Sequence, residues 1–174
     1  SCSLVGSEMC IRDRWEYFHL IFKQEGEKVL ASDAFRNFYE ANKEWLQPYA
    51  VFSYLRDAYK TPNFREWPKY ATYDAKEIET LCRPDSADYP HIAIYYYIQF
   101  NLHRQLLAAT EHARANGVVL KGDIPIGISR NSVEAWKEPH YFNLNGHNSG
   151  TILEHRVQIL ADQFTVVDTE SIPT

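Results

Sequence analysis

The chain has 174 residues, of which 45% are hydrophobic and 14% aromatic, and this composition excludes an intrinsically disordered protein. A net charge of −5 without a basic run argues against nucleic acid as a partner. The sequence also lacks the stretch of about 18 apolar residues that a membrane-spanning helix needs, so we expect no membrane partner.

The first fourteen residues, SCSLVGSEMCIRDR, lack the basic and apolar regions of a signal peptide. The string from Leu4 to Asp13 instead resembles the translation of a widely used transposase sequencing adaptor. We therefore expect residues 1–14 to be an adaptor-like leader that forms no packed structure. The only methionine, Met9, lies within this leader, so we expect the remaining chain to be a fragment of a longer gene.

The cysteines and histidines do not predict a metal or cofactor site. Cys2 and Cys10 lie in the leader, which leaves Cys82 alone, and no CxxC pair is present. His103 and His112 are nine residues apart, a spacing that places them on different sides of a helix. We expect no metal, no cofactor and no disulfide, and a reduced, cytoplasmic compartment.

A helix is predicted to start at Ser32, which can accept a hydrogen bond from the first turn. Apolar residues then recur at spacings of three and four, as on one face of a helix. Pro48 is expected to interrupt this helix, and a second helical segment is expected over YAVFSYLRDAY, residues 49–59, before Pro62.

The stretch 61–90 contains four prolines and reads as irregular, with a short helix at DAKEIETL, residues 74–81. Pro90 is expected to open the longest helix, which ends at Asn116-Gly117. Its apolar stripe comprises Ile92, Tyr95, Ile98, Leu102, Leu106, Ala109 and Ala113. A short buried strand is predicted at Val118–Leu120, which would complete an αβ unit of the kind found in parallel sheets and barrels.

Asp123 follows this predicted strand, at the end where barrel enzymes place functional groups. The alternative is that Asp123 caps the next turn. Asn131-Ser132 can start a further helix. Trp136 suits either the core or a platform for a sugar ring.

The segment GVVLKGDIPIGISRNSVEAWKEPHYFNLN, residues 117–145, resembles the 4-α-glucanotransferases, the amylomaltase or disproportionating-enzyme family (glycoside hydrolase family 77). Its Lys-Gly-Asp-Ile-Pro-Ile-Gly and Arg-Asn-Ser-Val strings are closest to the subgroup of the plant cytosolic disproportionating enzyme. Upstream, WLQPYAVFSYLRDAY, FREWP and IAIYYYIQFNLHRQL also resemble the family in the same order. The resemblance spans residues 29–145.

The resemblance implies an α/β fold, a (β/α)8 TIM barrel with helical insertions. We expect residues 15–145 to form a partial barrel domain with a helical insertion, mostly helical in this fragment. Residues 146–174 no longer follow the family pattern and are expected to be a divergent tail of unknown origin. A complete barrel takes about 250 residues, so this fragment is too short to close one.

The resemblance also implies a retaining transfer of α-1,4-glucan segments, in which one carboxylate attacks the sugar and a second protonates the leaving oxygen. The family motifs that carry these two groups and a third carboxylate do not occur in this chain. By the same resemblance Asp123 is a supporting carboxylate, not the nucleophile, and the expected substrate-binding residues are Asp123, Asn131, Ser132 and Trp136. The expected ligands are α-glucans: maltose, maltooligosaccharides, and glycogen or starch-like polymers.

Two other functions remain open from the residues alone. One is an α-glucan hydrolase of the same clan, against which the KGDIPIGISRNS segment argues. The other is a non-catalytic helical binding module, in which the aromatic stripes are core and Asp123 is a cap.

Overall fold

The computed structural model describes residues 4–120 and 128–142, and for residues 4–13 it describes the backbone alone. The chain divides into two compact units. The first unit consists of Ser1–Tyr59 and Asp74–Leu120, and the second of Lys60–Tyr73 and Lys121–Thr174. Within the described ranges every regular element is a helix, and no strand is present there. The described part is therefore mostly helical, as the sequence predicted.

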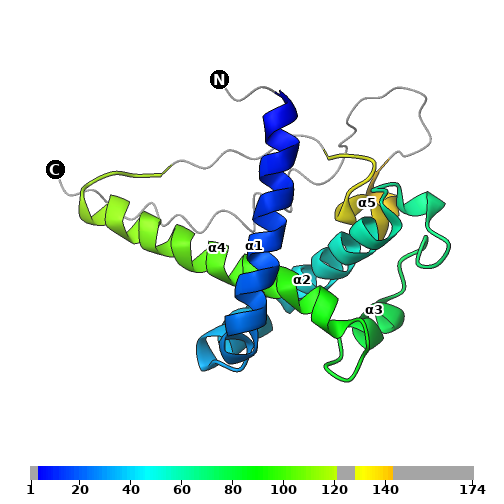
Figure 1. The fold of residues 1–174 in the computed structure, drawn as a ribbon, viewed down its shortest axis with the longest axis horizontal. Coiled ribbons are helices and arrows are strands. Elements are labelled where there is room, and N and C mark those ends of the chain that lie inside the picture. The colour runs from blue at the N-terminus through cyan, green and yellow to red at the C-terminus, as the bar shows by residue number, and fades with distance from the viewer. Residues whose placement is uncertain (1–3, 121–127, 143–174) are drawn as a thin grey trace. The chain divides into compact units, whose positions relative to one another are not determined.

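The first unit is built around one helix. Its elements are α1 (Leu4–Leu30), α2 (Asp33–Tyr59), α3 (Ala75–Leu81) and α4 (Tyr89–Ala115). Both α1 and α2 pack against α4, and α3 packs against α2. Figure 1 shows α1 crossing α4, so the first half of α4 is enclosed by its neighbours.

The helix starts follow the capping signals in the sequence. The Ser32 hydroxyl accepts a hydrogen bond from the backbone N–H of Phe35 at 3.2 Å and donates one to the carbonyl of Val29 at 2.6 Å. The Asp74 carboxylate accepts from the N–H groups of Lys76 and Glu77. These bonds satisfy donors that a helix N-terminus leaves without partners, and both predicted starts are confirmed.

The expected interruption at Pro48 is wrong, because α2 continues through this residue. A proline inside a helix removes one hydrogen bond and costs about 3 kcal/mol. Around it, however, Leu46, Ala50 and Val51 are fully buried. Burial of Leu46 and Val51 stabilises by about 1.5–3 kcal/mol each, so tertiary packing outweighs the local cost.

Consecutive tyrosines at the centre of α4 contact different neighbours, because successive side chains on a helix point about 100° apart. The Tyr95 ring meets Trp15 of α1 edge-on at 5.6 Å, whereas Tyr96 meets Tyr39 of α2 at 5.3 Å. Tyr97 packs against Phe22 of α1 at 5.5 Å. The three rings are 7%, 1% and 7% exposed. This part of α4 is therefore covered on most of its circumference.

The second half of α4 has a different environment. The helix ends as predicted, since the N–H of Val118 bonds to the carbonyl of Ala113 and Gly117 takes a left-handed φ of 71°. The predicted apolar stripe, however, is buried only at its beginning. Leu102 and Leu106 are 51% and 66% exposed. The apolar stripe is thus longer than the part of α4 that the other described residues cover.

The buried strand predicted at Val118–Leu120 is wrong. These residues have no regular secondary structure and are 51%, 77% and 51% exposed. A strand is stable only beside another strand that shares its backbone hydrogen bonds. The described residues offer none, so the αβ unit is absent from them.

The structure tests the prediction for the leader, residues 1–14, only in part. Helix α1 begins at Leu4, so the backbone of most of the adaptor-like leader is helical. Whether its side chains pack lies outside the described residues.

Phe100 offers a direct test of this core. It is 4% exposed, and its ring lies 5.5 Å from that of Phe35 and 5.4 Å from that of Phe38. We expect Phe100→Ala to lower the free energy of unfolding by about 3–4 kcal/mol, because it leaves a cavity between α2 and α4. Chemical denaturation monitored by circular dichroism measures this change. The matched control, Leu106→Ala on the exposed half of α4, should change stability by less than about 0.5 kcal/mol; equal losses in the two variants would contradict the assignment.

Candidate functional site

The residues that the sequence singled out lie in the second unit, where the structure describes only some of them. Asp123 lies outside the described residues, and so do Gly122 and Pro125. Asn131 and Ser132 immediately precede α5 (Val133–Lys137). The Ser132 hydroxyl accepts a hydrogen bond from the N–H of Ala135 at 3.3 Å, so the predicted cap is confirmed.

Asn131 has a local hydrogen bond of its own. Its N–H donates to the Ser129 hydroxyl at 3.2 Å. Ser129 thus accepts from a backbone N–H in the turn before α5, and Ser132 accepts from one in the first turn of α5. Their roles toward a substrate stay predictions.

Trp136 is the centre of an aromatic cluster in the second unit. It is 2% exposed, and its ring meets Trp67 at 5.7 Å and Tyr73 at 5.1 Å, both edge-on. Its indole N–H donates to the carbonyl of Tyr70 at 2.9 Å. Of the two roles that the sequence offered, this geometry gives Trp136 the packing role: it joins α5 to the stretch 60–73.

The stretch that receives Trp136 is held by further local contacts. It contains η1 (Phe64–Glu66), and the Trp67 indole N–H donates to the carbonyl of Thr61 at 3.0 Å. Tyr70 adopts a positive φ of 67°, which is uncommon for a residue with a side chain. The residue with this backbone conformation is also the one whose carbonyl accepts the hydrogen bond from the Trp136 indole. After α5, the turn η2 (Pro139–Tyr141) completes the described part of the unit.

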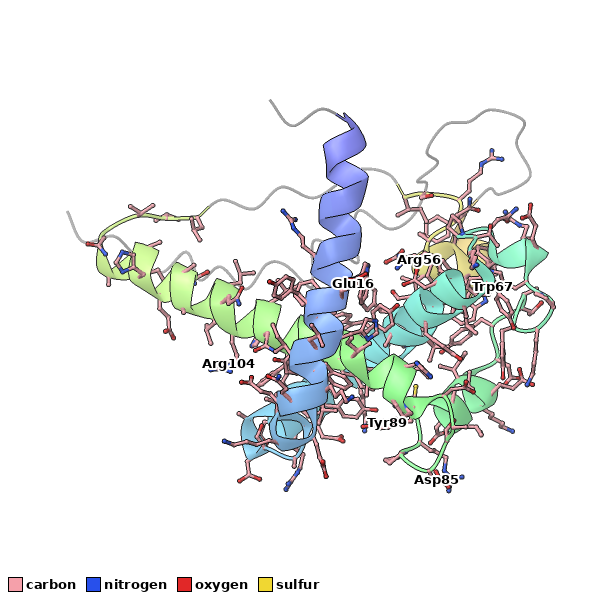
Figure 2. The ribbon with its side chains drawn as sticks, viewed as in Figure 1. Glu16, Arg56, Trp67, Asp85, Tyr89 and Arg104 are labelled. Atoms are coloured by element: carbon pink, nitrogen blue, oxygen red, sulfur yellow. The ribbon has the colours of Figure 1, made fainter. Side chains whose placement is uncertain are left out.

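In the first unit, polar side chains between α2 and α4 form a cluster that sequence reasoning missed. The Tyr95 hydroxyl donates to Asp57 at 2.6 Å, and the Arg56 guanidinium donates to the other oxygen of the same carboxylate at 2.7 Å. Figure 2 marks Arg56 on the last turns of α2. The sequence signal was weak, because adjacent Arg and Asp residues are common on exposed helix faces.

The electrostatics of this cluster favour a fixed arrangement over proton transfer. Burial raises the pKa of the Tyr95 phenol well above its usual value, and the bond to the Asp57 carboxylate raises it further. The bond to Asp57 also raises the pKa of Arg56. Tyr95 therefore stays protonated and Arg56 stays charged at neutral pH, so both act as hydrogen-bond donors.

Further hydrogen bonds tie α2 to the α4 region. The Tyr54 hydroxyl donates to Asp88, the residue before α4, at 2.6 Å. The Gln99 amide donates to the Tyr49 hydroxyl at 3.1 Å. Together with the Tyr95 bond to Asp57, these contacts fix the register of the two helices along their length.

The metal and membrane findings concern the described residues alone. Within them, no cluster of three or more His, Cys, Asp or Glu side chains is placed to hold a metal ion. Nor does any helix there combine the length and the hydropathy needed to cross a bilayer.

Comparison with known proteins shows to which family these elements belong. The sequence model of the family described as 4-alpha-glucanotransferase matches residues 2–152. The chain belongs to this family. The matched range includes the motifs quoted above and is wider than residues 15–145. No solved structure matches the chain.

Curated relatives of this 4-alpha-glucanotransferase family member carry the same description. The chain is 41% identical over 125 residues to the 4-alpha-glucanotransferase DPE2 of Oryza sativa subsp. japonica, which covers 72% of the chain and 13% of the relative. It is 34% identical over 99 residues to the Chlamydia trachomatis enzyme, covering 57% and 18%. For the Thermus thermophilus enzyme the identity is 28% over 142 residues, covering 80% and 28%. The chain thus spans less than a third of the length of each of these relatives.

Cys82 gives a test of the buried interface in this family member. It is 5% exposed, and its sulfur accepts a hydrogen bond from the Tyr96 hydroxyl at 3.1 Å. Burial raises the pKa of the thiol from 9.0 to about 11. We expect iodoacetamide at pH 8 to label Cys82 about 10²-fold more slowly than an ordinary cysteine, because so little thiolate is present. Peptide mass spectrometry measures the rate, and denatured chain is the control.

The pH dependence of the same thiol has a defined sign. A raised pKa means that the folded state holds the proton more tightly than the unfolded state. This contribution to stability is complete below pH 9.0 and is lost as the pH rises toward about 11. Labelling of native Cys82 at pH 8 as fast as in the denatured chain would contradict the burial.

Proposed function

We propose that this chain is part of a 4-alpha-glucanotransferase that moves α-1,4-glucan segments between acceptors. The observation that carries the proposal is the family match over residues 2–152. The 41% identity to the rice enzyme supports it, because that stretch covers 72% of the chain. The substrates proposed are maltose, maltooligosaccharides and glycogen or starch-like polymers, met in the cytoplasm.

In this proposal the chain contributes one part of a (β/α)8 barrel together with its helical insertion. We retain residues 15–145 as the contributing part, with an adaptor-like leader before it and a divergent tail after it. The first unit would supply the helical insertion, in which α1 and α2 pack against α4. In our proposal, Asp123 reaches its place in the active site only when the other parts of the barrel are present.

The proposed chemistry is a retaining double displacement, in which two carboxylates about 5 Å apart act as nucleophile and as acid/base. The longer protein would supply both, since the corresponding motifs are absent from this sequence. Asp123 would support the sugar being transferred through its charge. Asn131 and Ser132 would lie beside it, and Trp136 would hold that segment in place through its packing.

A chimera tests the proposed function. The 125 residues of this chain that align with the rice 4-alpha-glucanotransferase would replace the aligned segment of that enzyme. We expect the chimera to transfer glucosyl groups from maltose or maltotriose to an acceptor glucan, and the 174-residue chain alone to be inactive. Transfer by the isolated chain above the blank, or an inert but folded chimera, would contradict the proposal.

The same chimera tests Asp123. We expect Asp123→Asn to lower kcat by about 10²–10³, as when one positioned electrostatic contact is lost from an active site. Asp33→Asn is the matched control, because this carboxylate is 88% exposed on α2. An unchanged kcat with a lowered melting temperature would make Asp123 a structural cap.

A further inference from the structure

The stretch 60–73 contains the two non-glycine residues that have a positive φ in the described part of the chain. Lys60 has a φ of 57° and Tyr70 a φ of 67°, in the left-handed region that residues with side chains rarely adopt. Such a conformation persists only where the surrounding contacts determine it, and it is enriched at functional sites. The backbone of this stretch is therefore held in a specific conformation at both of its ends.

Tyr70 connects this stretch to α5 through its main chain. Its carbonyl accepts the hydrogen bond from the Trp136 indole at 2.9 Å, across 66 residues of sequence. The direction of a carbonyl depends on the φ and ψ of its own residue, so the left-handed conformation of Tyr70 determines where this acceptor points. Trp136 is 2% exposed, so the bond forms away from solvent, where losing a hydrogen bond is costly.

From Trp136 the contacts continue to the two residues before α5. The Trp136 N–H donates to the Ser132 carbonyl at 3.1 Å, and the Ala135 N–H donates to the Ser132 hydroxyl at 3.3 Å. Asn131 is the adjacent residue, and both Asn131 and Ser132 are half-buried. The positions of these two residues therefore depend on where the Trp136 side chain is held, and Tyr70 holds it through the indole.

We propose that Tyr70 and Trp136 are positioning residues for Asn131 and Ser132. The Tyr70 carbonyl fixes the Trp136 indole, and Trp136 fixes the two residues before α5. In this proposal the hydrogen bond carries the role in addition to the ring packing, and neither Tyr70 nor Trp136 touches the substrate. The role of Asn131 and Ser132 toward a substrate rests on the proposed function, whereas the connection to Tyr70 rests on contacts within the second unit.

The first experiment measures amide hydrogen exchange in the 174-residue chain. Trp136→Phe removes the indole N–H and keeps a ring beside Trp67 and Tyr73. We expect the amides of residues 135 and 136 to exchange about tenfold faster in this variant, because Tyr70 no longer holds α5. The amides of α4 should keep their exchange rates, because this helix belongs to the first unit. Unchanged exchange at residues 135 and 136 would overturn the proposal.

The second experiment measures transfer by a chimera in which residues 15–145 of this chain replace the corresponding segment of the rice enzyme. We expect Trp136→Phe to raise the KM for the donor, maltose or maltotriose, about tenfold, and to leave kcat within about twofold. A residue that only stabilises the fold would instead lower the apparent kcat through the amount of folded enzyme and leave KM unchanged. The control is Trp45→Phe, which removes an indole hydrogen bond to Asn42 in the first unit and should change neither constant.

Two variants of Tyr70 separate the conformation of its backbone from its side chain. Tyr70→Pro fixes φ near −65° and turns the carbonyl away, so we expect the same rise in KM as in Trp136→Phe and no further rise when the two are combined. Tyr70→Gly keeps the carbonyl and allows a positive φ, so it should raise KM by at most about threefold. Equal rises in the two Tyr70 variants, or additive effects in the double variant, would overturn the proposal. If Trp136→Phe fails to fold by circular dichroism, the two Tyr70 variants decide.

This proposal and the proposed function can fail separately. An active chimera whose KM is the same with and without Trp136→Phe would overturn the positioning role and leave the proposed function standing. An unmodified chimera that folds but is inert would contradict the proposed function and, with it, the substrate role of Asn131 and Ser132. Hydrogen exchange needs no turnover, so it would still decide whether Tyr70 holds α5.

Discussion

The packing of α2 against the first half of α4 is the contact on which the rest of the first unit depends. Phe35 and Phe38 enclose Phe100, and Tyr39 meets Tyr96, so aromatic rings from both helices interlock over several turns. The Phe35–Phe100 and Tyr39–Tyr96 pairs are edge-on, and such pairs add about 0.5–1.5 kcal/mol each beyond the area that they bury. Because this contact sets the helix spacing, it also places the polar groups that line the seam.

The polar side chains around α4 form hydrogen bonds at different degrees of burial. Deep in the seam, Tyr96 donates to Cys82, and burial keeps both protonated. Nearer the surface, Asp57 binds Tyr95 and Arg56 while keeping part of its carboxylate in solvent. Gln99 of α4 also donates to the Tyr49 hydroxyl of α2. The polar contacts around α4 therefore range from the buried Tyr96 to the partly exposed Asp57.

Local signals in the sequence predicted the starts and ends of the helices, because a cap such as Ser32 or a stop such as Gly117 acts within a few residues. The sequence predictions failed where the local structure depends on residues that are distant in the sequence. Burial around Pro48 keeps α2 continuous, and Val118–Leu120 form no strand without neighbours. The same holds for the site: the cap at Ser132 was predictable, whereas the Trp136 cluster and the bond between Asp57 and Tyr95 need partners 38 to 69 residues away.

The central claim is that α4 is one helix with two environments, a first half that forms the core and a second half that the described residues leave exposed. Amide hydrogen exchange along α4 of the 174-residue chain tests this claim most directly. The account predicts that Ile92–Phe100 exchange at least about 100-fold more slowly than Leu106–Ala115, because only the first segment is buried and opens with the core. Uniform protection from Ile92 through Ala115 would contradict it.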